Sequence, residues 1–234
     1  MECKESLVSL IYKGKGEKSA LSSYRPITVM SVIYRVAMQV VKGPIQSWME
    51  GENILGVLQN GFRTSRRMDD NLFIIAQLIE IMQAENRRMW VAFLYIKGAY
   101  DSVVHSLLWE KLEKTGMKRE VVQLLREVYK DNRVRIKWEG QVTCWVDVGR
   151  GLRQGCPLSP ILFTLYVREL EKCLEESGLG IDISIKRQGD IVQQKIPGLI
   201  YADDIVLMAN SRVRAASTTR YLWGKGGESG TRIQ

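Results

Sequence analysis

The amino-acid sequence predicts an α+β fold in which helices back an antiparallel sheet. The apolar run of eight residues at 89–96 has the length and composition of a strand buried on both faces. The segment 199–208 reads as strand, acidic turn and strand. Elsewhere, as over 69–88 and 159–176, apolar residues recur at the spacing of a helix. Hairpins and buried strands interspersed with helices are typical of an α+β domain.

The N-terminal third is expected to begin with a strand at 7–12 and a basic glycine-rich turn at 13–16. A helix should follow over 31–41. The Gly-Pro pair at 43–44 should end that helix, because proline lacks the helical N–H and clashes with the preceding turn. The helix over 69–88 can take its N-cap from the two aspartates or the asparagine at its start.

The remaining chain alternates helices with strands. Asp101 and Ser102 can cap a helix whose apolar positions run to Leu112, and Gly116 separates it from the next helix. A hairpin with one solvent-exposed face comes next, followed by a helix that begins at a Ser-Pro pair. In chain order the expected elements are helices at 101–112 and 121–128, the hairpin at 133–148, the helix at 159–176 and a strand at 181–186.

The composition favours a globular protein with a positive surface. Hydrophobic residues make up 45% of the 234 residues, and 34 Lys and Arg against 26 Asp and Glu give a net charge of +8. Such a surface attracts polyanions, although an ordinary solvated basic surface is the plain alternative. The four cysteines form no Cys-x-x-Cys pair and His105 is the only histidine, so no zinc site is expected. Without a signal peptide or membrane-spanning run, an intracellular protein with no membrane partner is expected.

Two adjacent carboxylates, Asp203 and Asp204, lie within the apolar segment 199–208. Like charges beside a core repel each other and lose hydration, so a nearby cation would stabilise them. Oxygen ligands favour Mg²⁺, which binds through one or two carboxylates and substrate phosphates. An exposed turn with no ligand is the alternative for an acidic pair of this kind taken alone.

The glycine- and proline-rich segment 151–160 lies upstream of this pair. Gly155 allows a ligand to approach the backbone closely, and Gln154 offers both amide donors and an acceptor. The start of the following helix at Ser159 adds partial positive charge. Taken alone, the segment could equally be a structural loop.

These two motifs together resemble reverse transcriptases. Arg-Gln-Gly-Cys-Pro-Leu-Ser-Pro at 153–160, followed by Tyr-Ala-Asp-Asp at 201–204, is similar to their pattern, and the surrounding residues resemble those of non-LTR (LINE-type) retrotransposons. The likeness covers residues 7 to about 212 and includes segments at 24–27, 59–63 and 93–103.

The resemblance implies an RNA-directed DNA polymerase with fingers at 1–88, a palm at 89–212 and no thumb. RNA template, DNA primer and deoxynucleoside triphosphates are its implied partners, and two Mg²⁺ ions its implied cofactor. Asp203 and Asp204 would be the catalytic metal ligands, together with the backbone of Ile96. Tyr100 would lie under the incoming sugar and exclude a 2′-hydroxyl, and other residues would contact the base pair or the triphosphate. The implied nucleotide-binding residues are Lys13 or Lys15, Arg25, Tyr100, Gln154 and Gly155.

Tyr95 departs from the family pattern. The resemblance places a metal-bridging aspartate five residues before Tyr100, where this chain has Tyr95. A phenol of pKa about 10 is neutral at pH 7 and binds Mg²⁺ poorly. Asp101 cannot replace the missing carboxylate, since six extended residues span up to roughly 20 Å. Each ~1.36 kcal/mol of lost stabilisation slows a reaction about tenfold, so this copy is expected to be inactive or nearly so.

The C-terminal segment 213–234 is a second departure. It is rich in Gly, Ser, Thr and Arg, and its apolar residues do not recur at helical spacing. If the segment is back-translated with permissible codons and read one base later, the new reading frame can encode an amphipathic helix. An aberrant, out-of-frame tail is therefore expected. The function indicated is reverse transcription, with a non-catalytic nucleic-acid-binding relic as the alternative. An RNA-dependent RNA polymerase or intron maturase shares the palm, but Tyr100 argues against an RNA polymerase.

Overall fold

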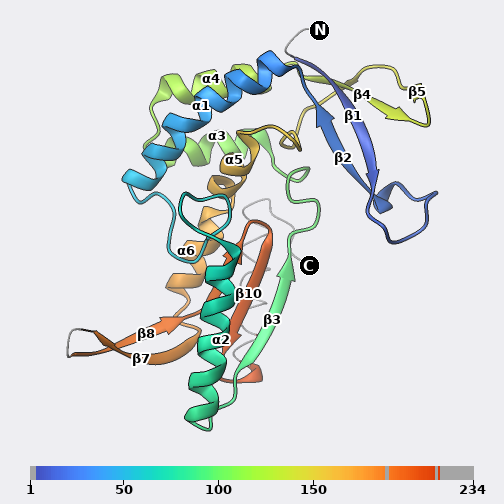
Figure 1. The fold of residues 1–234 in the computed structure, drawn as a ribbon. Helices are drawn as coiled ribbons and strands as arrows, with labels where there is room; N and C mark the ends of the chain where they lie inside the picture. Colours follow the sequence, from blue (N-terminus) through green and yellow to red (C-terminus); the bar gives the residue numbers. More distant parts are fainter. Residues whose placement is uncertain (1–3, 188–189, 214–215, 217–234) are drawn as a thin grey trace. The chain divides into compact units, whose positions relative to one another are not determined.

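The α+β class is confirmed by the computed structural model, which describes residues 4–187, 190–213 and 216 (Figure 1). The helices are η1 (Leu21–Ser23), α1 (Val32–Gly51), α2 (Met68–Ala84), α3 (His105–Lys114), α4 (Arg119–Tyr129), α5 (Ser159–Tyr166) and α6 (Arg168–Glu176). The strands are β1 (Glu5–Tyr12), β2 (Tyr24–Val29), β3 (Trp90–Tyr95), β4 (Arg133–Trp138), β5 (Gln141–Val142), β6 (Val146–Asp147), β7 (Ile181–Arg187), β8 (Asp190–Ile196), β9 (Gly198–Tyr201) and β10 (Asp204–Ala209). The expected aberrant tail lies almost entirely outside the described residues.

The chain forms two compact units, and each combines segments from both halves of the sequence. The first unit comprises the described parts of Met1–Trp48 and Tyr100–Phe163, and the second those of Met49–Ala99 and Thr164–Gln234. These units do not divide the chain near residue 88, so the assignment of fingers and palm stays a prediction from resemblance. In the described part of the chain, no helix is both long enough and apolar enough to cross a membrane.

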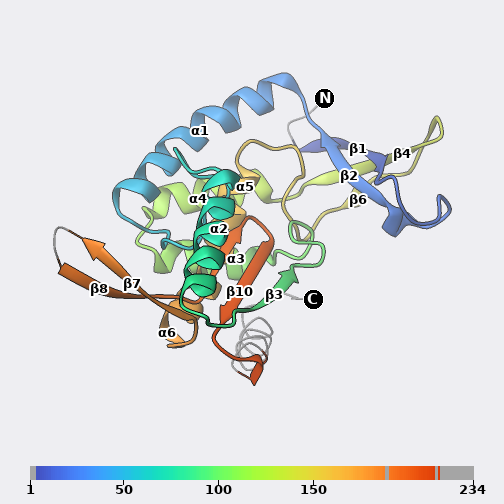
Figure 2. The same cartoon turned by 60° about the horizontal axis from the view of Figure 1, so that its bottom comes forward.

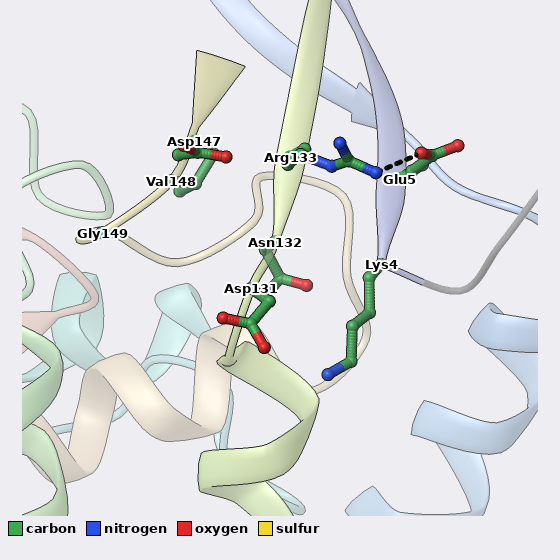
Figure 3. A pocket seen from close by; sticks show the side chains of 8 residues that line it. All are labelled: Lys4, Glu5, Asp131, Asn132, Arg133, Asp147, Val148 and Gly149. Atoms are coloured by element: carbon green, nitrogen blue, oxygen red, sulfur yellow. Dashed lines mark hydrogen bonds and ion pairs between the residues drawn. The ribbon is translucent and has the colours of Figure 1, made fainter. Parts of the chain in front are cut away.

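The first unit is built on a sheet of order β2-β1-β4-β5, with β6 also paired to β4. β1 is antiparallel to β2 but parallel to β4, a long-range pairing that no local pattern predicts. An ion pair of 2.9 Å between Glu5 and Arg133 joins the first residues of the parallel strands (Figure 3). The expected hairpin at 133–148 is confirmed in outline, although its second half is interrupted between β5 and β6.

The second unit contains an antiparallel sheet of order β3-β10-β9. Helix α2 lies along this sheet in both views (Figures 1 and 2), and its Leu78 and Met82 pack in one core with Leu199 and Met208. The β7–β8 hairpin adds Ile181 and Ile183 to that core. The strand–turn–strand reading of 199–208 is therefore confirmed, and the sheet it forms presents the acidic turn at one end.

Helix α1 does not end at the Gly43-Pro44 pair but continues to Gly51. A proline inside a helix costs about 3 kcal/mol. Beyond it, Ile45 and Met49 are almost fully buried, and each such side chain contributes roughly 1.5–3 kcal/mol. Burial of these side chains can therefore offset the proline, which is why the local signal for a helix end was wrong.

Strand β3 is not buried on both faces, contrary to the expectation from its apolar run. Phe93 is 78% exposed and Tyr95 is 47% exposed, whereas Leu94 is buried. β3 pairs with β10 and is an edge of the sheet among the described strands. An unbroken apolar run thus fails to distinguish a central strand from an edge strand with one exposed face.

The structure also corrects two helix starts and divides one predicted helix in two. α2 begins after Arg67, whose N–H donates to Asp70 at 2.7 Å, and α3 begins after Val104 rather than at Asp101. The predicted helix 159–176 is broken at Val167 into α5 and α6. The first residue of a helix depends on which backbone N–H groups are left without a helical partner. The spacing of apolar residues locates that position only to within about one turn.

Candidate active site

The acidic pair lies at the turn between β9 and β10. Most apolar residues of both strands are buried, so the turn lies at the end of a well-packed sheet. Ala202 has a φ of 58°, a left-handed conformation that is unfavourable for alanine. Asp203 follows it and is half-buried, whereas Asp204 is exposed. The turn thus presents two consecutive carboxylates in different surroundings.

Asp203 is held against the end of β3. The Ile96 N–H donates to the carbonyl oxygen of Asp203 at 3.2 Å, and Ile96 is fully buried. Burial raises the pKa of the Asp203 carboxyl, a hydrogen bond from its own backbone N–H lowers it, and the charge of Asp204 raises it further. The protein alone therefore disfavours the charge of Asp203, as expected where a cation would complete the site.

Tyr95 lies directly across from the acidic turn. The Cα of Tyr95 is the register partner of the Cα of Asp204 in the antiparallel β3–β10 pair. The described residues contain no group of three or more His, Cys, Asp or Glu side chains arranged to hold a metal ion. The turn therefore offers two carboxylates, Asp203 and Asp204, and the residue across from Asp204 is the phenol-bearing Tyr95.

The donors at the turn suit a hard divalent cation, which prefers oxygen ligands. Two carboxylates and a neutral phenol supply less negative charge than three carboxylates. The residues present therefore fit one weakly held divalent ion and do not fit a complete two-ion set.

In the first unit, the loop after β6 packs against the segment that contains Tyr100. Leu152 N–H donates to the Tyr100 carbonyl at 2.8 Å, and Gly151 N–H donates to the Val103 carbonyl at 2.7 Å. The Tyr100 ring stacks on Phe163 with centroids 5.2 Å apart and planes 13° from parallel. These contacts fix the backbone and the ring of Tyr100 while leaving the side chain partly exposed.

Gln154 and Gly155 lie beside strand β2. Thr28 N–H donates to the Gln154 carbonyl at 2.8 Å. Gly155 has a φ of 109°, a conformation that favours glycine, and a Cβ there would lie 3.1 Å from the Thr28 carbonyl oxygen, a tight contact. The Gln154 amide donates to Asp101 at 3.3 Å, and both side chains line a cavity of about 260 Å³.

Asp101 does not cap α3 and instead faces this cavity. Loss of hydration raises the pKa of its carboxyl, and the Gln154 hydrogen bond and the charges of Arg150 and Lys13 oppose that rise. Arg150 also donates to the Asp101 carbonyl at 3.2 Å. A charged cluster therefore surrounds the predicted nucleotide-contacting amide in this unit.

Lys13 and Arg25 come from the β1–β2 hairpin. Arg25 is the register partner of Ile11, and the Lys13 N–H donates to the Ser23 carbonyl at 2.9 Å. Because strand side chains alternate between faces, Lys13 and Arg25 lie on the same face of the hairpin. Lys13 Nζ donates to the Ser22 carbonyl at 2.8 Å. The predicted triphosphate-binding cations thus share one surface, with Lys15 exposed in the adjoining turn.

The predicted site residues fall into two groups. Asp203, Asp204, Tyr95 and Ile96 gather in the second unit, and the predicted nucleotide-binding residues all belong to the first unit. A further cavity of about 510 Å³ in the first unit contains none of them (Figure 3). It is lined by Lys4, Glu5, Asp131, Asn132, Arg133, Asp147, Val148 and Gly149.

Sequence reasoning did not single out the residues that support the acidic turn. Gln59 hydrogen-bonds the backbone of Ala202, and Glu171 accepts hydrogen bonds from the segment that carries Gln59. Gln59 lies in the segment 59–63 that resembles the family, where no role was predicted for it. Glu171 lies among exposed charged residues on an amphipathic helix. No local signal separates Glu171 from its exposed neighbours.

The chain is similar to polyproteins of mobile elements. It is 26% identical over 230 residues to a Pol polyprotein of the type-1 retrotransposable element R2 from Nasonia vitripennis, covering 90% of this chain and 21% of that protein. It is 26% identical over 239 residues to the 149 kDa protein of transposon TX1 from Xenopus laevis, covering 96% of this chain and 17% of that protein. The chain therefore spans about a fifth of the length of these relatives.

Solved structures with a similar fold include telomerases. The telomerase of Candida tropicalis, in complex with a fragment of telomeric RNA, superposes with a TM-score of 0.61 at 11% identity, covering 100% of this chain and 40% of that one. At this identity the likeness concerns the fold alone. Residues 12–234 match the reverse transcriptase (RNA-dependent DNA polymerase) family. With these relatives and this fold, the chain belongs to the reverse transcriptase family, as a domain of the non-LTR retrotransposon kind.

Proposed function

We propose that this domain is built for RNA-templated DNA synthesis and that Tyr95 leaves this copy with little or no catalytic activity. The observation that carries the proposal is the register of Tyr95 across from Asp204 at the acidic turn. Reverse transcriptases work with divalent metal ions and a nucleic-acid template. We further propose that the metal ion is Mg²⁺, that the primer is DNA and that the substrates are deoxynucleoside triphosphates.

Each predicted residue has a distinct task in this proposal. Asp203 and Asp204 would hold a divalent ion, proposed to be Mg²⁺, which would supply positive charge to stabilise charge that develops in the transition state. Tyr100, fixed by its stacking on Phe163, bounds the sugar and excludes a 2′-hydroxyl. Gln154 and Gly155 of the first unit contact the new base pair. Arg25 and Lys13 of the same unit bind the triphosphate.

A non-catalytic nucleic-acid-binding relic is the second candidate. The net charge of +8 and the incomplete carboxylate set favour it. In that case the domain retains attraction to phosphates and has lost the chemistry. The two candidates differ in whether restoring one carboxylate restores metal binding and DNA synthesis.

The test substitutes aspartate for Tyr95. We expect Tyr95→Asp to raise Mg²⁺ affinity, because a third carboxylate adds charge beside Asp204. Primer extension is compared in a chimera that carries a repaired reading frame and a thumb from a related element. Phe93→Asp is the matched control, since it adds a carboxylate to an exposed position of the same strand, across from Val206 instead of Asp204.

Two results would reject the proposal. If the chimera with Tyr95 extends DNA as fast as the Tyr95→Asp chimera, Tyr95 does not occupy a metal-binding position. If Phe93→Asp raises Mg²⁺ affinity as much as Tyr95→Asp, the gain reflects added charge alone.

A further inference from the structure

A segment far from the acidic turn in sequence lies beside it and extends the sheet of the second unit. Gln59 forms a parallel bridge with Ile200 of β9. Ile200 N–H donates to the Leu58 carbonyl at 2.9 Å, and Asn60 N–H donates to the Ile200 carbonyl at 3.0 Å. The segment 58–61, which we call the cradle, therefore runs along β9 towards the turn.

The Gln59 side chain binds both backbone groups of the residue before the acidic pair. Its Oε1 accepts the Ala202 N–H at 3.0 Å and the Gly61 N–H at 2.8 Å. Its Nε2 donates to the Ala202 carbonyl at 3.3 Å. Gln59 is 2% exposed, so these bonds are shielded from water. One buried amide thus holds Ala202 from both sides in the left-handed conformation that alanine otherwise disfavours.

Gly61 brings the cradle backbone into direct contact with the same residue. A Cβ on Gly61 would lie less than 3.0 Å from the Ala202 nitrogen, closer than side-chain carbons approach other atoms. Only glycine permits this approach without a shift of the turn. The requirement for Gly61 is therefore set by Ala202.

Glu171 on α6 anchors the cradle. Its carboxylate accepts the N–H groups of Leu58 at 2.6 Å and Gln59 at 2.9 Å, and that of Gly56 at 3.1 Å. Glu171 is 2% exposed. A buried acid that pairs with consecutive backbone donors determines where the segment can lie, because leaving those donors unpaired is costly.

We propose that Gln59 is a positioning residue that holds Ala202, and through it the carboxylates of Asp203 and Asp204, in the arrangement needed to bind a divalent cation. Glu171 acts indirectly, because it holds the backbone of Gln59 in place. The functional meaning rests on the proposed metal-binding role of the turn. The hold of Gln59 on Ala202 can be measured without any enzymatic activity.

The test measures amide hydrogen exchange at single residues by NMR in the full chain. Gln59→Met keeps the side-chain volume and removes the acceptor and the donor, so exchange of the Ala202 N–H should become at least about tenfold faster. Gln59→Glu keeps an acceptor for the Ala202 and Gly61 N–H groups and should return exchange to within about threefold of the unaltered chain. Gln77→Ala, at an exposed glutamine on α2, is the control and should change nothing at Ala202.

Exchange of the Leu207 N–H, in the fully buried part of β10, reports on the unit as a whole. If Gln59→Met accelerates Leu207 as strongly as Ala202, Gln59 is a general stability residue and the proposal fails. The proposal also fails if Ala202 exchange is unchanged in Gln59→Met, or if Gln59→Glu gives no rescue.

Metal binding is measured separately with Mn²⁺ by electron paramagnetic resonance. We expect Gln59→Met to weaken Mn²⁺ binding at least about threefold, while Gln77→Ala leaves it unchanged. If Asp203→Asn does not weaken Mn²⁺ binding in the otherwise unaltered chain, the proposed function of the turn is wrong, whatever the exchange results. If Asp203→Asn weakens binding and Gln59→Met does not, the turn binds metal but Gln59 does not position it.

Discussion

Glu171 shows how one buried side chain links pH to stability. Burial raises the pKa of its carboxyl above the usual value of 4.5, and the hydrogen bonds from Gln59, Leu58 and Gly56 oppose that rise. The net shift is upward, so the folded chain binds a proton at Glu171 more readily than the unfolded chain does. The stability linked to this group is fully present below pH 4.5 and is lost as the pH rises through the higher folded-state pKa.

We therefore predict that Glu171→Gln alters the pH dependence of unfolding. Urea unfolding, compared between pH 7 and pH 5, should show a smaller gain on acidification in Glu171→Gln than in the unaltered chain. Glu176→Gln, at an exposed position of the same helix, is the control and should retain the full dependence. An unaltered dependence in Glu171→Gln would mean that this carboxyl does not titrate differently in the folded chain.

At the scale of elements, helix α1 keeps a glycine and a proline in its interior and still runs without a break. Gly43 is exposed, and a Cβ there would meet no atom within 4 Å. Gly14, in the β1–β2 turn, has equally open space but a φ of 78°. The two glycines differ in backbone conformation and not in crowding.

Gly43→Ala should stabilise the chain by about 0.8–1 kcal/mol, because alanine is the better helix former. Gly14→Ala should destabilise it by roughly 1–2 kcal/mol, because the left-handed conformation is strained for alanine. Both values can be obtained from urea unfolding midpoints. Equal effects of the two substitutions would contradict the assignment of α1 as a continuous helix through Gly43.

At the scale of the whole molecule, the net charge of +8 is the feature that bears on partners. We expect nucleic-acid binding to be weak, tolerant of sequence and strongly salt-dependent, because it relies on contacts of Lys and Arg with phosphates. Affinity for a primer–template duplex should fall steeply between low and physiological salt. A flat salt response would contradict this expectation.

Single substitutions can test which residues make the phosphate contacts. Arg25→Ala should reduce the slope of log affinity against log salt by about 1, as expected for the loss of one phosphate contact. Arg126→Ala is the matched control, because Arg126 forms a 2.7 Å ion pair with Glu113 on the surface of the helices. Equal slopes for both variants would remove Arg25 from the proposed phosphate-binding surface.

The sequence by itself determined the elements whose signals are local. Apolar period and turn residues located β1, α2, α4, β4 and the β9–β10 hairpin, and two motifs identified the reverse transcriptase family. The acidic turn was recognisable because carboxylates inside an apolar hairpin contradict their surroundings. Tyr95 stood out for a different reason, since its position relative to Tyr100 departs from the family pattern.

Tertiary structure alone decided the features that depend on residues distant in sequence. The parallel pairing of β1 with β4, the exposed face of β3 and the continuity of α1 past Pro44 each follow from what packs against the element. The support of the acidic turn by Gln59 and Glu171 belongs to this class as well. A hydrogen bond between Gln59 and Ala202 joins residues 143 apart, and no periodic pattern records which buried donor meets which acceptor once the chain has folded.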